Sequence, residues 1–365
     1  MTLTLAIDQG THATRAVVFD ADGRRLALGR APVDLQRISQ AEVEQSPEDI
    51  LMSLEQALSN VLSDPSVDPA AIGQAGLATQ RSSVLAWERS SGRALSAVLS
   101  WQDTRTREAL AGLASETDAV SRRTGLRLSP HYGAGKLRWL LEHNAAVQQA
   151  RDNNDLVIGP LASYLLQHLT GADTATVDHA NASRTLLWDR ASRDWSDELL
   201  ALFSLSAEYL PQCVPNVYSF GHLNVDGQPI PLTVCSGDQS AALFSLGEPK
   251  PGNAYLNMGT GAFMQCLLPN IQPQTSPDNL LQSVVWDGPG ETRQVLEATV
   301  NGVGSALSFV EKELGLSSEQ SKSRYAEWLV NAKKIPLFIN GVSGLGSPFW
   351  RPNFASGFFG DLSLI

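Results

Sequence analysis

The chain has 365 residues, of which 43% are hydrophobic and 18% charged, so it is a globular protein long enough for two domains. Its formal net charge of −11 excludes proteins that bind nucleic acid through clustered Lys and Arg. The N-terminal residues lack a basic segment, and residues 156–177, the longest weakly charged stretch, contain Gly159, Pro160 and Asp173. We therefore expect a cytoplasmic protein with no signal peptide and with neither nucleic acid nor a membrane as a partner.

Residues 3–33 predict three strands. Apolar runs alternate with turn residues, and Asp22-Gly23 supplies the positive φ that a tight hairpin turn requires. The predicted order is strand, loop, strand, turn and strand, with apolar runs over 3–7, 15–19 and 26–33 and a Gly10-Thr11 loop after the first.

A helix is predicted after Ser46, because Ser caps helices and Pro47 fits the first helical position. Apolar residues between Ile50 and Leu62 keep helical spacing. A strand follows over 72–78 and ends at Thr79-Gln80-Arg81. Strands that alternate with helices predict an α/β layer architecture.

Residues 101–210 are predicted to be mainly helical, with loops at 124–127 and 178–185. The second loop contains Asn181-Ala-Ser183, which matches a glycosylation sequon but is interpreted as a turn. A strand at 231–235 then leads into Ser236-Gly-Asp-Gln239 at the start of a helix.

The stretch 247–252 is dense in Gly and Pro and predicts the junction between an N-terminal domain, 1–246, and a C-terminal domain, 247–365. Just beyond it, residues 254–264 again predict strand, Gly-Thr turn and strand. Because this pattern echoes residues 5–19, we expect a duplicated fold that holds a nucleotide in the cleft between its halves.

The first Gly-Thr loop is a candidate phosphate cradle. Gly10 permits an unusual backbone angle and close approach, so that N–H groups near Thr11 and the hydroxyls of Thr11 and Thr14 point at phosphate oxygens. Asp8 at the strand end suits Mg²⁺ held through water. The alternative is a plain turn capped by Asp8.

Asp238 stands between a predicted strand and a predicted helix, where a carboxylate can accept the proton of an attacking hydroxyl. The alternative role is a helix N-cap. The second turn, Gly259-Thr260-Gly261, offers an opposed cradle for the other end of a triphosphate, in a chain without a Walker GxxxxGK[ST] loop.

Arg81 supplies a guanidinium group with several N–H donors in a fixed geometry, and Trp101 supplies a flat apolar ring. Recognition of sugars and polyols uses both features. Each has an ordinary alternative: a surface ion pair for Arg81 and a core position for Trp101.

Blocks in the same order along the whole chain resemble the FGGY family of carbohydrate kinases, and within it the glycerol kinase group. These blocks are Asp8-Gln-Gly-Thr11, Thr79-Gln-Arg81, Trp101-Gln102, Asn181-Ala-Ser-Arg-Thr185, Gly237-Asp-Gln239 with 241–244, Gly259-Thr-Gly261 with Phe263, and 344–348 with Trp350.

The resemblance implies an α/β fold with two ribonuclease H-like domains of the actin and hexokinase type, the second incomplete. These domains close over ATP, Mg²⁺ and a small polyol or sugar, and a homo-oligomer, dimer or tetramer, is expected. The implied roles are metal association for Asp8; phosphate binding for Thr11, His12, Thr14, Arg15, Gly259, Thr260 and Gly261; general base for Asp238; and substrate binding for Arg81, Ser82, Trp101, His131, Asp238, Gln239 and Phe263.

Three departures from the family pattern shape the expected activity. Ser82 stands where glycerol kinases have Glu, and His131 where they have Tyr, so we expect the preferred substrate not to be simply glycerol. The chain also ends before the family's adenine loop, so weak nucleotide binding is expected.

The leading hypothesis is an ATP-dependent kinase that transfers the γ-phosphate to a hydroxyl of a small polyol or sugar. Three alternatives stay open at this stage: a ketose kinase of the same family, a catalytically silent polyol- or nucleotide-binding pseudokinase, and another ATPase of the same superfold, such as a chaperone-like protein.

Overall fold

The computed structural model describes residues 2–225, 228–258, 261–269, 279–331, 336–342, 344–351 and 353–360. These residues form two compact units. The first contains the chain up to Pro249 together with Ser283–Gln294, and the second contains most of the remaining C-terminal chain. The domain boundary at 246/247 remains a prediction. The segment Ser283–Gln294 follows this boundary in the chain but belongs to the first unit.

A six-stranded sheet forms the centre of the first unit, in the order β14-β15-β6-β1-β2-β3. β1, β2 and β3 are antiparallel neighbours, as the alternation over 3–33 predicts, and Gly23 in the turn has φ 76°. β6 and β15 extend the sheet parallel to β1. The strands are β1 (Leu3–Gln9), β2 (Ala13–Phe19), β3 (Arg25–Pro32), β6 (Ile72–Thr79), β14 (Val217–Val225) and β15 (Gln228–Gly237).

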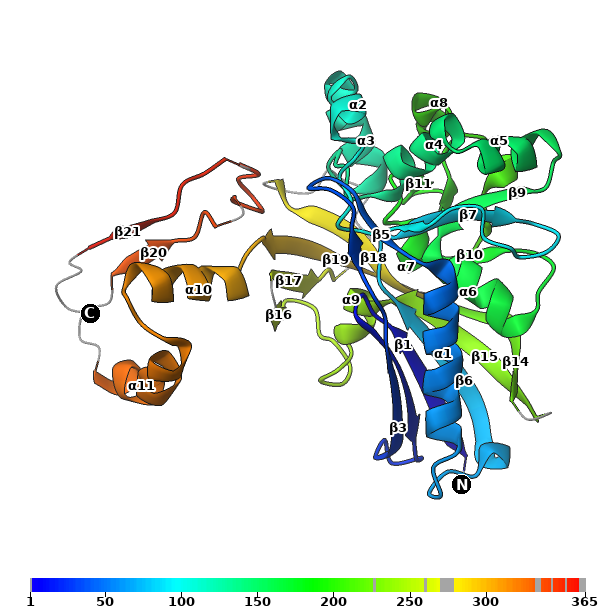
Figure 1. Ribbon diagram of the computed structural model, residues 1–365, viewed down its shortest axis with the longest axis horizontal. Coiled ribbons are helices and arrows are strands. Elements are labelled where there is room, and N and C mark those ends of the chain that lie inside the picture. The colour runs from blue at the N-terminus through cyan, green and yellow to red at the C-terminus, as the bar shows by residue number, and fades with distance from the viewer. Residues whose placement is uncertain are drawn as a thin grey trace. The chain divides into compact units, whose positions relative to one another are not determined.

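The helix α1 (Pro47–Leu62) packs on β2 and β3, and Figure 1 shows it along these strands. The N–H of Asp49 donates to Ser46 Oγ at 3.0 Å, so Ser46 is the predicted N-cap. α6 (Leu161–Thr170) packs on β14, β15 and β6. Buried Leu, Ile, Val and Ala side chains of these helices and strands form one core cluster.

At Gly29 in β3, α1 approaches the sheet closely. A Cβ there would lie 2.0 Å from the Ala57 carbonyl oxygen and 2.8 Å from the Val61 nitrogen, both backbone atoms of α1. We expect Gly29→Ala to lower the free energy of unfolding by about 3 kcal/mol, because α1 must move off the sheet. Urea unfolding of the purified chain measures this loss.

The matched control for this prediction is Gly76→Ala in β6. A Cβ at Gly76 has its nearest neighbours at 3.7 Å, which is ordinary van der Waals contact, so the same substitution should cost less than about 1.5 kcal/mol. Equal losses of stability in the two variants would contradict the argument from close approach.

A second sheet of the first unit has the order β4-β5-β8-β7-β9. In addition, β10 pairs with β13 and β11 pairs with β12, as two separate two-stranded sheets. These strands are β4 (Gln36–Arg37), β5 (Val43–Gln45), β7 (Val84–Glu88), β8 (Val98–Leu99), β9 (Leu156–Pro160), β10 (Thr176–Asp178), β11 (Trp188–Asp189), β12 (Asp194–Trp195) and β13 (Gln212–Val214).

The predicted helical stretch 101–210 does contain α2 to α8, although β9 to β12 interrupt it. The predicted loop at 178–185 is wrong in part, because the short helix α7 lies within it, and Asn181 of the sequon is buried. The remaining helices are α2 (Arg107–Ala111), α3 (Thr117–Thr124), α4 (Gly133–His143), α5 (Ala145–Asp152), α7 (His179–Ala182), α8 (Asp197–Phe203) and α9 (Asp238–Ala242).

In the C-terminal part of the chain, β16, β17, β19 and β18 form a four-stranded sheet in this order. β16 and β17 are antiparallel, so the two strands predicted on either side of the second Gly-Thr turn are confirmed, while Gly259 and Thr260 lie outside the described residues. The elements are β16 (Ala254–Met258), β17 (Ala262–Leu267), β18 (Leu281–Gly288), β19 (Glu291–Val300), α10 (Gly304–Glu313), α11 (Ser318–Asn331), β20 (Leu337–Ile339) and β21 (Gly357–Phe359). Among the described residues, no helix combines the length and apolar character needed to cross a membrane.

Candidate active site

The carboxyl ends of three parallel strands meet at one edge of the six-stranded sheet. Gln9 of β1 pairs with Thr79 of β6, and Thr79 also stands opposite Gly237 of β15. Residues that follow directly on these strand ends are therefore neighbours, although they are far apart in the sequence. This is the position at which open α/β sheets usually hold their ligands.

Asp238 is the first residue of α9, and Gly237 occupies the N-cap position. The Asp238 side chain accepts a hydrogen bond from the adjacent N–H of Gln239 at 2.7 Å, and Asp238 itself is not at the N-cap position. The helix-cap alternative is therefore wrong. Burial raises the pKa of Asp238, while the positive charges of Arg81 and Arg184 oppose this rise. The carboxylate is a stronger base than an exposed Asp.

Arg81 follows β6 and is buried, with 7% of its surface exposed, so it is not a surface ion pair. Its Nε lies 3.9 Å from Asp238 Oδ1. The side chain reaches this place by passing over Gly237, where a Cβ would lie 2.4 Å from Arg81 Cγ and 2.5 Å from Cδ. Only a residue without a side chain at 237 leaves Arg81 in this position.

The first Gly-Thr loop joins β1 to β2. A Cβ on Gly10 would lie 3.2 Å from the Ala13 carbonyl oxygen, so close approach accounts for this glycine. The predicted unusual backbone angle is absent at this residue, since its φ lies outside the left-handed region. The Thr11 hydroxyl accepts a hydrogen bond from Trp101 Nε1 at 3.0 Å, and His12 beside it is exposed.

The predicted contact of the Thr14 hydroxyl with phosphate is wrong. Thr14 is fully buried, and its Oγ1 lies 2.6 Å from Ser53 Oγ of α1. The reason is the period of two in a strand, which turns Thr14 toward α1 and Arg15 toward the opposite face. Arg15 Nη1 pairs with Asp8 Oδ2 at 2.9 Å on that more exposed face.

Four of the residues predicted to bind substrate, Arg81, Ser82, Trp101 and His131, follow β6 or β8 or precede α4. Trp101 has 36% of its surface exposed, so it is not a core residue. His131 Nδ1 lies 3.0 Å from the Trp101 carbonyl oxygen. Desolvation by neighbouring protein atoms, together with the positive charges of Lys136 and Arg107, lowers the pKa of His131 even though part of this residue is exposed. The Ser82 hydroxyl lies 3.4 Å from the Arg184 carbonyl oxygen.

Lys136 of α4 belongs to this site and was missed by the sequence analysis. Its Nζ donates to the carbonyl oxygens of Ser82, Ser100 and His131 at 3.2, 2.6 and 2.9 Å. One pattern pointed to it: Lys136 occupies a buried position in the helical stripe of Gly133, Leu137, Leu140 and Leu141. A lysine on the apolar face of a helix indicates a specific set of acceptors.

The second unit carries the other predicted residues. A Cβ on Gly261 would lie 3.0 Å from the Val300 carbonyl oxygen, so this turn also needs a glycine for close approach. Phe263 of β17 is half-buried and stands opposite Thr299 of β19. The predicted phosphate-binding residues Gly259 and Thr260 lie outside the described residues.

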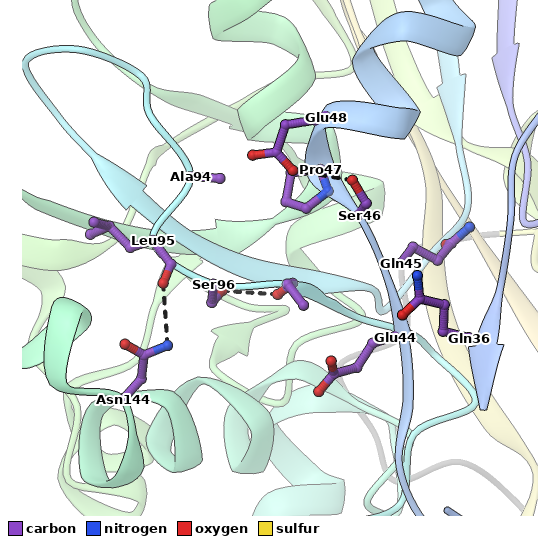
Figure 2. Close-up of a pocket in the computed structure, with 11 residues that line it drawn as sticks. Gln36, Glu44, Gln45, Ser46, Pro47, Glu48, Ala94, Leu95, Ser96 and Asn144 are labelled. Atoms are coloured by element: carbon purple, nitrogen blue, oxygen red, sulfur yellow. Dashed lines mark hydrogen bonds between the residues drawn. The ribbon is translucent and has the colours of Figure 1, made fainter. Parts of the chain in front are cut away.

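A pocket with a volume of about 470 Å³ lies at the start of α1. Figure 2 shows Ser46, Pro47 and Glu48 on one side of it and Leu95 and Asn144 on another. None of the predicted site residues lines it. One of its lining residues, Gln45, donates from Nε2 to the Thr11 carbonyl oxygen at 2.9 Å, but the pocket is not the site described above.

Comparison with known proteins identifies the class. Residues 3–245 match the N-terminal domain of the FGGY family of carbohydrate kinases. A glycerol kinase of Geobacter sp. (strain M21) is 32% identical over 368 residues, which cover 100% of this chain and 74% of the relative. A glycerol kinase of Methylobacterium nodulans is 33% identical over 363 residues, covering 98% and 72%.

Solved structures of carbohydrate kinases are also similar to this chain. The glycerol kinase of Plasmodium falciparum with ADP has a TM-score of 0.89 and 26% identity, covering 99% of this chain and 73% of that chain. A xylulose kinase of Rhodospirillum rubrum shares the fold, with a TM-score of 0.84, 20% identity and coverage of 99% and 73%.

The chain belongs to the FGGY family of carbohydrate kinases. It is a phosphotransferase with an alcohol group as acceptor, and its family implies ATP as donor and a small carbohydrate as acceptor. The predicted α/β fold class of the actin and hexokinase type and the predicted sugar or polyol kinase are therefore confirmed.

Proposed function

We propose that this kinase transfers the γ-phosphoryl group of ATP to a hydroxyl of a small polyol or sugar with Asp238 as general base. The observation that carries this proposal is the pairing of Asp238 with Arg81 at the common edge of β1, β6 and β15. A panel of polyols and ketoses with ATP, measured by ADP formation, tests it. A silent binding protein would bind polyols and form no ADP above background.

Asp238 accepts the proton of the attacking hydroxyl as the oxygen approaches the γ-phosphorus. Burial raises its pKa and strengthens it as a base, and the positive charge of Arg81 opposes this rise and favours the ionised form. The exposed indole of Trp101 offers an apolar surface to the carbon face of the acceptor, and Arg81 and Gln239 are proposed for the same site. Phe263 of the second unit remains a substrate-binding residue proposed from the sequence.

Mg²⁺ is part of the proposal, and the donor set near Asp8 is compatible with it. The Asp8 side chain is 41% exposed and supplies hard oxygen atoms, although Arg15 already pairs with one of them. Within the described ranges, no group of three or more His, Cys, Asp or Glu is arranged to hold a metal alone, so Asp8 would bind the ion together with waters and phosphates. When bound, Mg²⁺ neutralises phosphate charge.

The phosphates would lie against the first loop, at the N–H groups near Thr11 and His12, with Arg15 as a nearby cation. Gly259, Thr260 and Gly261 are proposed for the opposite end of the nucleotide. The cytoplasmic location and the homo-oligomer, dimer or tetramer, also remain proposals from the sequence.

Acceptor preference is proposed to depend on position 82. Ser82 lies beside Arg81 and adopts φ 66°, and its hydroxyl is directed to the Arg184 carbonyl oxygen. We expect Ser82→Glu to raise kcat/KM for glycerol, relative to the best longer polyol or ketose, by about tenfold, because a carboxylate beside Arg81 accepts a hydroxyl hydrogen bond. Steady-state kinetics on the same acceptor panel measure the ratio.

The control is Ser82→Gln, which has the same length without the charge and should leave the ratio closer to that of the wild-type chain. An unchanged ratio in a folded Ser82→Glu protein would show that position 82 does not select the acceptor. The proposal also fails if the wild-type chain already prefers glycerol to every longer acceptor tested.

A further inference from the structure

We propose that Lys136 is the positioning residue of the acceptor site: its ammonium group fixes the loops that carry Arg81, Trp101 and His131 by binding one backbone carbonyl of each. The inference rests on the proposed function, because these loops are the proposed acceptor loops. It assigns Lys136 no contact with the acceptor or with the transferred phosphoryl group.

The positions of the three carbonyl oxygens support Lys136 as a common anchor for the three loops. Ser82 follows β6, Ser100 follows β8, and His131 precedes α4, so the three carbonyl oxygens bound by Lys136 belong to segments that are distant in the sequence. Ser82 directly follows Arg81, Ser100 directly precedes Trp101, and the third carbonyl belongs to His131 itself. A single side chain therefore holds three parts of the site in register.

The backbone conformation of Ser82 is a second reason to regard Lys136 as an anchor. Its φ of 66° lies in the left-handed region, which a residue other than Gly adopts at a conformational cost. Such a backbone persists only where its surroundings hold it, and the carbonyl of Ser82 is held by Lys136 Nζ at 3.2 Å. Loss of this contact frees the backbone next to Arg81.

The contacts require the charged form of Lys136. An ammonium group has three N–H donors for three carbonyl oxygens, whereas a neutral amine has only two. Burial, with a smaller contribution from Arg105, disfavours the ammonium and lowers the pKa of Lys136 to about 7, while the charge of Asp103 opposes this shift. A fully buried cation reduces stability, and an apolar side chain of similar length fills the same space at lower cost.

The anchored loops also connect to the proposed phosphate loop. His131 Nδ1 lies 3.0 Å from the Trp101 carbonyl oxygen, and Trp101 Nε1 donates to Thr11 Oγ1 at 3.0 Å. The acceptor loops thus reach Thr11 through the indole of Trp101 and, from Gln80 beside Arg81, through the Gln45 side chain. The main effect of losing Lys136 should fall on the acceptor and a smaller one on ATP.

The test compares Lys136→Met with the wild-type chain in steady-state kinetics, acceptor calorimetry and thermal unfolding. Met keeps the length and removes the donors. We expect KM for the acceptor to rise about tenfold or more, and KM for ATP to change less than about threefold, because three hydrogen bonds to the acceptor loops are lost. The Tm should stay the same or rise. Leu140→Ala, on the same face of α4, is the matched control that lowers Tm without raising acceptor KM.

Two outcomes overturn the inference. One is a folded Lys136→Met protein whose acceptor KM and calorimetric affinity match the wild-type values. The other is a parallel loss of acceptor affinity, ATP affinity and Tm that Leu140→Ala reproduces, which shows a purely structural role. Failure of the proposed function is distinct: the wild-type chain then binds polyols without forming ADP, and weaker polyol binding by Lys136→Met still supports the positioning role.

Discussion

Replacing Asp238 with Asn is expected to lower kcat by about a hundredfold to ten-thousandfold, while the chain stays folded and still binds its acceptor. Asn has the same shape and cannot accept the proton of the attacking hydroxyl. The hydrogen bond from the N–H of Gln239 can be kept by the Asn side-chain oxygen, so α9 should begin at the same residue. Single-turnover measurements with saturating ATP and acceptor isolate this loss from substrate binding.

The matched control is Asp197→Asn. Asp197 is the first residue of α8, as Asp238 is of α9, but it is exposed and lies outside the site. This variant reports the loss of a negative charge at a helix start and should retain the wild-type kcat. A folded Asp238→Asn protein that turns over within about threefold of wild type would remove Asp238 from the role of base.

The pH profile offers a further check on the same residue. Since burial raises the pKa of Asp238, the acid limb of kcat/KM should lie above the range of an ordinary Asp, near 3.9. Activity falls as the pH drops through this raised pKa, because the protonated acid is no longer a base. The positive charge of Arg81 lowers the pKa of Asp238, so removing that charge moves the acid limb to higher pH.

The second large effect is expected for Gly237→Ala, which should lower kcat/KM for the acceptor by about a hundredfold. The new methyl group would occupy the space of Arg81 Cγ and Cδ, which lie 2.4 and 2.5 Å from its position. Because these atoms are near the start of the side chain, the whole guanidinium must leave its place beside Asp238. A hundredfold loss corresponds to about 3 kcal/mol, which is the upper end of what a hydrogen bond from the Arg81 guanidinium to an acceptor hydroxyl contributes.

A double-mutant cycle identifies the cause. If Gly237→Ala acts by displacing Arg81, then adding it to Arg81→Met should produce little further loss of kcat/KM. Gly76→Ala in β6 is again the control, because its Cβ has room. Additive losses in the cycle would show that the glycine acts through the backbone of α9 and not through Arg81.

The elements predicted correctly from the sequence have local causes. The hairpin after β2 follows from Asp22-Gly23, and the start of α1 follows from Ser46 and Pro47, since each motif fixes the conformation of its own few residues. The helix α7 was not predicted. Its four residues are held by burial and by the Asp178 side chain, which caps the N–H of Asn181, and tertiary packing of this kind leaves no periodic pattern in four residues.

In the candidate site, too, predictions with a local cause differ from those that depend on tertiary packing. Asp8, Arg81 and Asp238 lie at or just beyond the ends of β1, β6 and β15, and parallel strands bring their carboxyl ends together, although Arg81 was singled out only with the family resemblance. Thr14 was misplaced because a motif gives residue types without the direction in which a strand turns each side chain. Lys136 was overlooked because its partners are backbone carbonyls from three separate segments, and these have no signature in the sequence.

The membership of Ser283–Gln294 in the first unit sets a limit on how the protein can be divided. Arg184 Nη1 donates to Ser283 Oγ at 2.8 Å, and His179 Nδ1 lies 2.5 Å from Asp287 Oδ2. A recombinant fragment that stops at 246 or 249 would leave these buried polar groups without their partners and uncover the face of Trp188 that packs with Val284. Domain swaps and deletion series in this chain should therefore transfer Ser283–Gln294 together with the N-terminal residues, as a discontinuous module.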